Sequence, residues 1–324
     1  MIARLRGLAA GCVGFVLVLF VFSPDLRAAE GGEPAYAPGS FASFMDALPA
    51  KPGFAVFNYF VYYNGNADAS RQIPIAGQIG AGVEATTYAN SFGGFFITPL
   101  KLLGGYYAVG VSLPIVWNTV SAEVTLPAGG TAQRSDDANG LGDIEFWPIA
   151  MSWAALANNL HVTALGGIYA PTGGFQNNRL ANQGLGYWTF EPGVIVSYFN
   201  QKNGIEGTSY VGYDFNTTNS DTDYKSGQVF HVDGTAAWHF LPVGKGAFGA
   251  GATGFYLQQT TGDSGSGARL GGFKTMSAGL GPVISYGAQY SKLGFAVSVK
   301  WLPQIGVSNT VKGDYFWIKL GVTF

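Results

Sequence analysis

Histidine and carboxylate side chains recur at alternate positions in several extended-looking segments of this sequence. In residues 229–240, His231, Asp233 and His239 alternate with large apolar residues such as Val232 and Trp238. Because successive side chains of a strand point to opposite faces, the polar groups share one face and the apolar groups the other. Histidine and carboxylate groups that share a face can bind a metal ion, transfer a proton or line a polar passage.

The same alternation places titratable side chains on the polar faces of other segments, together with Asp143 and Glu145. The candidates for a polar interior or a solute path are His161, Glu191, Glu206, Asp214, His231, Asp233, His239, Lys300 and Lys319. The simpler hypothesis is a hydrogen-bonded filling of the interior, because buried polar groups need partners. The alternative is that these charges line a route and select the solute, and we favour this second role for Glu191.

The spacing of these residues does not predict a catalytic or metal centre. His239 lies about 26 Å along the strand from His231, too far to share a metal ion with it and Asp233. Residues 249–254 match the dinucleotide fingerprint by letter, but they lie within a strand and no helix follows. Residues 262–265 resemble a protease nucleophile motif within a Gly/Ser-rich loop that has no nearby histidine. We therefore expect no cofactor, no metal and no enzyme activity.

Alternation of large apolar and mixed residues predicts about twelve strands after residue 51. In the last of them, Phe316, Ile318 and Leu320 alternate with Trp317 and Lys319. One face is apolar and the other accepts a lysine, as in strands that have lipid outside and a polar interior. The expected strands are residues 53–63, 83–97, 105–118, 142–154, 160–170, 186–199, 204–215, 227–240, 247–258, 273–287, 292–302 and 313–324.

The connections between these strands alternate in length. Short turns such as 155–159 and 200–203 alternate with long polar loops such as 119–140 and 171–185. Outer-membrane barrels have short periplasmic turns, longer external loops and an even number of strands. The predicted fold class is therefore all-β: a closed antiparallel transmembrane β-barrel of about twelve strands, residues 52–324, with a short N-terminal segment before the first strand.

Composition agrees with a barrel in lipid. Only 11% of the residues are charged, 15% are aromatic and 49 of 324 are glycine, whereas soluble proteins average roughly 25% charged residues. After residue 28 no apolar run reaches about 18 residues, so no transmembrane helix is expected.

Residues 1–28 are expected to form a signal peptide. Arg4 and Arg6 precede the apolar stretch 8–22, and cleavage is expected after Ala28. The single cysteine, Cys12, lies inside that stretch, which disfavours a lipoprotein anchor and leaves the mature chain without disulfides. Export would leave 14 of the 17 basic and 18 of the 19 acidic residues, a net charge of −4, which argues against nucleic-acid binding. Residues 29–51 form a periplasmic or plug segment in which 40–48 could make a short amphipathic helix.

Two stretches resemble a known family. Residues 135–153, which read SDDANGLGDIEFWPIAMSW, and residues 169–199, which begin YAPTGGFQNN, resemble outer-membrane proteins grouped as the MetA-pathway of phenol degradation family. The resemblance implies a barrel through which aromatic or other hydrophobic compounds cross the outer membrane. It also implies that Phe324 belongs to the signal read by the barrel assembly machinery.

The function expected from these observations is passive uptake of small hydrophobic or aromatic compounds. The alternatives are a narrow general porin for small polar solutes, or a structural or adhesive barrel with binding loops. The expected partners are outer-membrane lipid, the barrel assembly machinery and the solute, and the expected state is a monomer.

Overall fold

The computed structural model describes residues 34–76, 78–125 and 129–324. The expected signal peptide and the first residues of the 29–51 segment lie outside this described part. Within it there is no helix, and therefore none long and apolar enough to cross a membrane.

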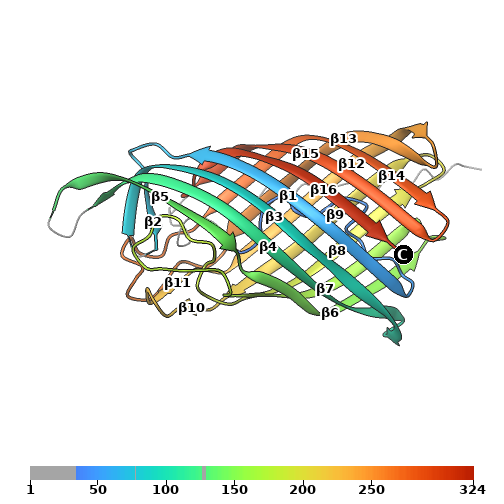
Figure 1. Ribbon diagram of the computed structural model, residues 1–324, viewed down its shortest axis with the longest axis horizontal. Coiled ribbons are helices and arrows are strands. Elements are labelled where there is room, and N and C mark those ends of the chain that lie inside the picture. Colours follow the sequence, from blue (N-terminus) through green and yellow to red (C-terminus); the bar gives the residue numbers. More distant parts are fainter. Residues whose placement is uncertain (1–33, 77, 126–128) are drawn as a thin grey trace, which may run out of the picture.

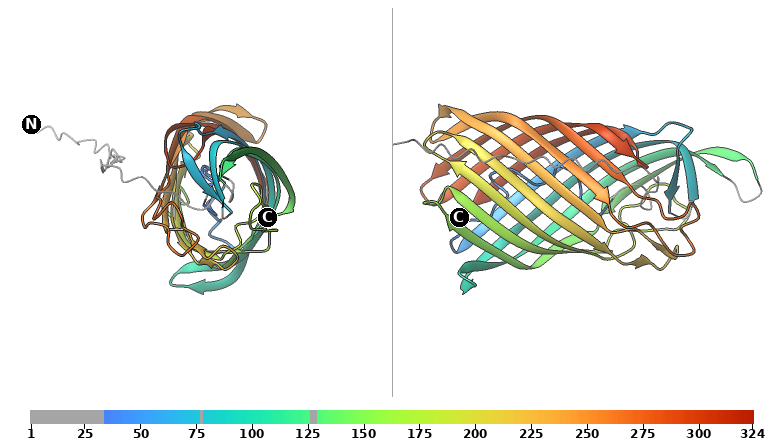
Figure 2. Two further views of the ribbon diagram at one scale, coloured as in Figure 1. Left: turned by 90° about the vertical axis from the view of Figure 1, so that its left-hand side faces the viewer. Right: turned by 180° about the vertical axis from the view of Figure 1, so that it is seen from behind.

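Twelve antiparallel strands of the described chain close into a barrel (Figure 1, Figure 2). Strand β1 pairs with β3 on one side and with β16 on the other, so Tyr59 lies opposite both Ser91 and Lys319. Closure satisfies the strand edges, as lipid requires, and the predicted fold class is confirmed. The barrel strands are β1 (Gly53–Asn66), β3 (Gln78–Leu102), β4 (Gly105–Thr125), β6 (Ile144–Ala155), β7 (Leu160–Ala170), β8 (Thr189–Asn200), β9 (Ile205–Asn216), β12 (Val229–Val243), β13 (Gly246–Gln259), β14 (Met276–Tyr290), β15 (Leu293–Ser308) and β16 (Lys312–Thr323).

Short strands outside the barrel wall lie in regions that were predicted as loops. They are β2 (Gln72–Ile75), β5 (Thr131–Leu141) and the small pair β10 (Thr218–Asn219) and β11 (Tyr224–Lys225). Strand β5 pairs with the extended end of β4, and this hairpin projects beyond the barrel (Figure 1). The sequence of β5 itself is largely polar on both faces, so alternation gives no sign of this strand. The short helix considered for residues 40–48 is wrong, because that stretch consists of turns and bends.

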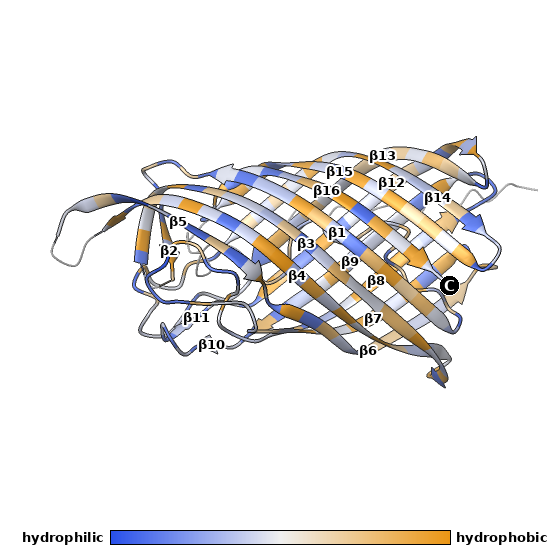
Figure 3. Cartoon of the chain, viewed as in Figure 1, coloured by the Kyte–Doolittle hydropathy of each residue, from blue (hydrophilic) through white to orange (hydrophobic). Residues whose placement is uncertain are grey.

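The two faces of the wall differ in the way that alternation predicts. Trp238 is 58% exposed on the outside of β12. The adjacent Ala237 and His239, which share the face of His231, are buried inside. Apolar and polar residues alternate along the strands in Figure 3. Outward apolar residues recur on every side of the barrel, which gives the wall a continuous contact with lipid.

Arginine on this outer face is expected to be costly in a depth-dependent way. Val297 lies four residues inside β15, at the depth expected for the bilayer midplane, and Leu293 is the first residue of the strand, on the same face. We expect Val297→Arg to lower the free energy of unfolding in lipid vesicles by about 2–4 kcal/mol, and Leu293→Arg by about 0–1 kcal/mol, because charge is tolerated near the interface. Denaturant titration of tryptophan fluorescence in vesicles measures both, and equal costs would contradict the placement of Val297 deeper in the lipid than Leu293.

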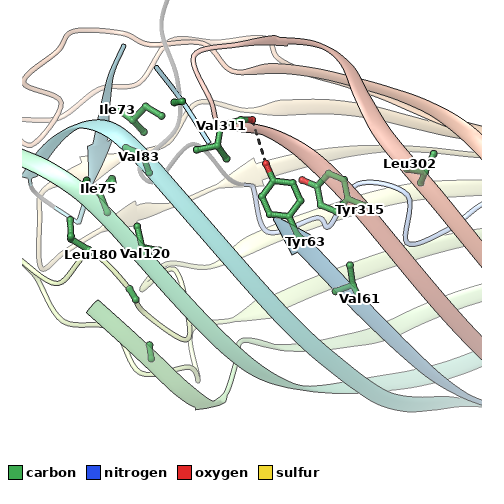
Figure 4. Packing of buried hydrophobic residues seen from close by; sticks show 14 of the residues in the cluster. Val61, Tyr63, Ile73, Ile75, Val83, Val120, Leu180, Leu302, Val311 and Tyr315 are labelled. Carbon is green, nitrogen blue, oxygen red and sulfur yellow. Dashed lines mark hydrogen bonds between the residues drawn. The ribbon is translucent and has the colours of Figure 1, made fainter. Parts of the chain in front are cut away.

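A hydrophobic cluster fills the external end of the interior (Figure 4). Ile73 and Val83 pack there with Val120 and Leu180, and the Tyr63 hydroxyl donates to the carbonyl of Val311 at 3.4 Å. The cluster joins β1, β3 and β4 to three external connections, which contribute Ile73, Leu180 and Val311. The interior is therefore packed at this end rather than open along its whole length.

Candidate functional site

Residues 34–50 lie inside the barrel, where the lumen side chains hold them (Figure 2). Asp233 is the first anchor of this inner segment. Its carboxylate accepts hydrogen bonds from the Tyr36 hydroxyl and from the backbone N–H groups of Gly39, at 3.4 Å, and Phe41, at 3.2 Å. The segment, which has no regular secondary structure of its own, thus finds partners on the wall of the barrel.

Two buried lysines form the second set of anchors. Lys300 Nζ donates to the carbonyl oxygens of Gly39, at 3.1 Å, and Phe41, at 2.6 Å. Lys319 Nζ contacts both oxygens of Asp46, at 2.6 and 2.7 Å. Both lysines are fully buried, so each charge requires these partners.

Glu206 and His239 make the third anchor, near the short turn between β8 and β9. The backbone N–H of Phe44 donates to Glu206 Oε1 at 2.9 Å, and His239 Nε2 lies 2.7 Å from Glu206 Oε2. The Phe44 ring meets the His239 ring edge-on, with centroids 5.1 Å apart. This end of the segment is therefore fixed by a hydrogen bond and by an aromatic contact.

Glu191, Asp214 and His231 form a separate buried group. His231 Nε2 lies 3.4 Å from Glu191 Oε1 and 3.4 Å from Asp214 Oδ1. The Tyr210 hydroxyl donates to Glu191, and the ring of Tyr36 stacks on His231 with centroids 3.8 Å apart. These three residues touch the inner segment chiefly through Tyr36.

The predicted candidates thus divide into two sets and an outlier. Asp233, Glu206, His239, Lys300 and Lys319 hold or support the inner segment, whereas Glu191, Asp214 and His231 meet one another. His161 is half-buried beside the β6–β7 turn and belongs to neither set. Whether any of these residues lines a solute path stays a prediction.

A cavity of about 270 Å³ lies between the inner segment and the wall formed by β1, β3, β4, β6, β7 and β16. Its boundary is rich in aromatic side chains, and its few charged groups lie at one side. The aromatic residues around it are Tyr36, Phe41, Phe57, Tyr59, Tyr63, Trp147, Tyr169, Tyr315 and Trp317, and the charged ones are Asp143 and Glu145. Ser, Thr, Asn and Gln side chains supply further polar groups, and a mainly apolar cavity with a minority of polar groups is typical of a small-molecule site.

An external loop covers this cavity, and Asp143 fixes its two ends. The carboxylate of Asp143 accepts hydrogen bonds from the N–H groups of Gly173, at 3.0 Å, and Leu185, at 2.8 Å. Residues 182–185 of the loop line the cavity. The connection between β5 and β6 therefore holds the loop in its inward position.

The same loop is tied to the β4–β5 hairpin by a partly exposed ion pair. Arg179 donates to both oxygens of Asp136, with Nη2 2.7 Å from Oδ1 and Nε 3.0 Å from Oδ2. These hydrogen bonds lower the pKa of Asp136 below its ordinary value. A bidentate arginine–carboxylate pair holds the loop more specifically than a single contact would.

Acid should release this loop. The pKa of Asp136 is lower in the folded state, so its contribution is complete above the ordinary aspartate pKa and is lost as pH falls through the folded-state value. Because the pair is partly exposed, the effect should be about 1 kcal/mol or less. We expect proteolysis within residues 171–185 to quicken under acid in the parent, and in Asp136→Asn to be a few times faster at neutral pH and to change less with pH. A parent loop whose cleavage does not change with pH would contradict this.

The comparisons place the chain among known barrels. The family described as "Putative MetA-pathway of phenol degradation" matches residues 63–320. The chain belongs to this family. It is a bacterial outer-membrane β-barrel, as its closed wall and apolar outer face require. No curated protein sequence matches it significantly.

Solved structures of similar fold include outer-membrane barrels. The COG4313 outer membrane channel from Pseudomonas putida F1 is 12% identical with a TM-score of 0.58, over 89% of this chain and 100% of that one. The β domain of the Bordetella autotransporter BrkA is 10% identical with a TM-score of 0.46, over 85% and 99%. A FadL homologue from Pseudomonas aeruginosa is 12% identical with a TM-score of 0.40, over 94% and 99%. The first likeness supports the fold alone, and the other two carry no argument.

Sequence reasoning missed the partners that the inner segment supplies. Asp46 is the one acidic residue in residues 40–48, and Tyr36 stands in a Gly/Pro-rich stretch. The signal that could have found Asp46 is the pair of lysines on lumen faces, since a buried ammonium group requires a carboxylate or carbonyl partner.

Proposed function

We propose that this family member carries small hydrophobic or aromatic compounds passively across the outer membrane, by way of the aromatic-lined cavity. The cavity is the observation that carries the proposal. Phe57, Tyr59 and Trp147 offer apolar surface and ring edges to a solute, and a neutral aromatic would gain by leaving water for it. The few polar groups would orient the solute more than they would bind it.

The inner segment would act as a plug in this mechanism. Residues 34–50 lie between the cavity and the wall at Lys319 and Glu206, so passage toward the periplasm requires the segment to shift. We therefore assign a gating role to the expected 29–51 segment. Loop residues 182–185 would control entry from the outside.

The narrow general porin receives less support. Such a pore needs a continuous hydrated passage lined by charge, whereas Lys300, Lys319 and Asp233 are buried in contacts with the inner segment. We also expect the protein to be a monomer folded by the barrel assembly machinery. We propose no catalytic role.

Filling the cavity should block uptake. Ala89 lines the cavity from β3, whereas Val109 on the neighbouring β4 is 37% exposed on the lipid side. We expect Ala89→Trp to lower uptake of radiolabelled toluene by cells about tenfold or more, because a bulky ring occupies the binding volume. Val109→Trp adds the same ring outside the barrel and is expected to leave uptake at the parent level.

Both variants must show the heat-modifiable gel mobility of a folded barrel. Uptake at the parent rate by folded Ala89→Trp would remove the cavity from the route. A loss of uptake in both variants would show that added bulk, rather than occupation of the cavity, is responsible.

A further inference from the structure

Glu191, Asp214 and His231 come from three adjacent strands, β8, β9 and β12, and converge on one point of the inner wall. Their side chains are 1%, 0% and 0% exposed, and one ligand atom from each lies within 4.8 Å of the other two. Gly212 makes room for them. A Cβ atom there would come within 2.6 Å of His231 Nε2 and 3.0 Å of Glu191 Oε1.

The distances within this triad do not fit hydrogen bonding between its members. His231 Nε2 is 3.4 Å from both Glu191 Oε1 and Asp214 Oδ1, longer than a good N–H···O bond. Two ligands that each lie about 2.1 Å from a tetrahedral zinc ion are about 3.4 Å apart. The two separations from His231 Nε2 therefore match edges of a tetrahedral coordination polyhedron, and the third lies within 4.8 Å.

Several polar atoms of the triad also lack a hydrogen-bond partner among the described residues. They are Glu191 Oε2, both carboxylate oxygens of Asp214, and both ring nitrogens of His231. The backbone of Tyr36 and the imidazole of His231 lie beside Asp214 without satisfying the usual geometry. Buried atoms without partners are costly and are rare in native proteins, which indicates that a ligand belongs here.

The charges of the triad are unbalanced as well. Lys319 and His239 already pair with Asp46 and Glu206, and Lys300 donates to backbone carbonyls of the inner segment. Glu145 lies close enough to interact electrostatically with Glu191, Asp214 and His231, so three carboxylates share one histidine. Buried negative charge of this amount requires a counter-charge, which either protons or a cation must supply.

We propose that Glu191, Asp214 and His231 bind one divalent transition-metal ion of the zinc type. The imidazole nitrogen selects such ions over Mg²⁺ and Ca²⁺, which prefer oxygen ligands alone. The Tyr210 hydroxyl, which donates to Glu191, orients that carboxylate in the way that outer partners of metal ligands do. The ion would link three strands directly beneath Tyr36 of the inner segment. The sequence predicted no metal site. The proposal differs because the strand register, which brings these three side chains together, could not be read from the sequence.

Metal analysis of the full-length exported protein tests the site. The barrel is refolded in detergent after treatment with a chelator, with Co²⁺ or Zn²⁺ as the added metal. We expect one metal ion per chain after gel filtration, unaffected by excess Mg²⁺ or Ca²⁺. His231→Gln and Asp214→Asn should weaken retention at least by the roughly 10–100-fold that loss of an outer partner costs elsewhere.

His239→Gln is the matched control. It removes the other fully enclosed imidazole, which pairs with Glu206, and should keep the metal. Equal retention in His231→Gln and the parent would overturn the proposal, as would a folded parent that holds no stoichiometric metal because protons supply the counter-charge. If the triad variants fail to fold, anomalous diffraction from parent crystals grown with Co²⁺ decides. A peak among the three side chains supports the site, and its absence overturns it.

Discussion

Replacing Lys319 with methionine should destabilise the folded barrel by about 3–5 kcal/mol, because it leaves a buried carboxylate without its cation. Lys319 and Asp46 are both fully enclosed, and the ammonium group contacts both oxygens of the carboxylate. The Tyr59 hydroxyl also donates to Asp46 at 2.6 Å, but a hydroxyl does not neutralise the charge. Urea titration of tryptophan fluorescence in lipid vesicles measures the loss.

Two further variants separate charge from packing. Lys319→Met with Asp46→Asn leaves no unpaired charge and should recover much of the lost stability, since a buried pair replaced as a whole costs little. Lys292→Met removes an exposed lysine at the β14–β15 turn and should change stability by about 0.5 kcal/mol or less. If Lys319→Met costs no more than Lys292→Met, then Asp46 does not anchor the inner segment through this pair.

The barrel wall was predictable because lipid imposes a simple rule on it. Each strand must alternate between an apolar and a mixed face, and this pattern located β7 at its observed limits. The other barrel strands were located within three residues at each end, except β3, β4 and β15, whose ends extend five to seven residues further. The end of β4 was missed because its outward face changes from large apolar residues to Thr119, Ser121 and Glu123, although Val120 and Val124 still point inward. Strand β5 was missed as well, because it pairs with that unpredicted extension of β4.

The sequence predicted which side chains of the candidate site point inward, but not which groups they contact. Alternation indicated that Lys300, Asp233 and His231 point inward, and all three are buried there. It could not show that residues 34–50 supply the partners of Lys300 and Asp233, because that segment has no periodicity. Nor could it show that Asp214 and His231 meet, since this depends on the register that places His231 opposite Gly212.

Deleting residues 34–50 should convert the barrel into a conducting pore. The anchors of the inner segment would lose their partners, and water would replace them along the wall. The groups freed or already lining this part of the interior include two lysines and a larger number of carboxylates, namely Lys300, Lys319, Glu145, Glu191, Glu206, Asp214 and Asp233. A pore with this excess of acidic groups should favour K⁺ over Cl⁻, because the fixed charge of a lumen selects the opposite ion.

Planar bilayer recordings should therefore show discrete, cation-selective current steps for the deletion variant and none of comparable size for the parent. A synthetic peptide of residues 34–50, added from the periplasmic side, should reduce the current, because Asp233, Lys300 and Lys319 can bind it again through the same contacts. In the deletion background, Lys319→Met should raise selectivity for K⁺ further by removing one of the two lysines. A folded deletion variant that stays closed would show that the external hydrophobic cluster, rather than the inner segment, sets the barrier. Anion selectivity would contradict the exposure of the carboxylates.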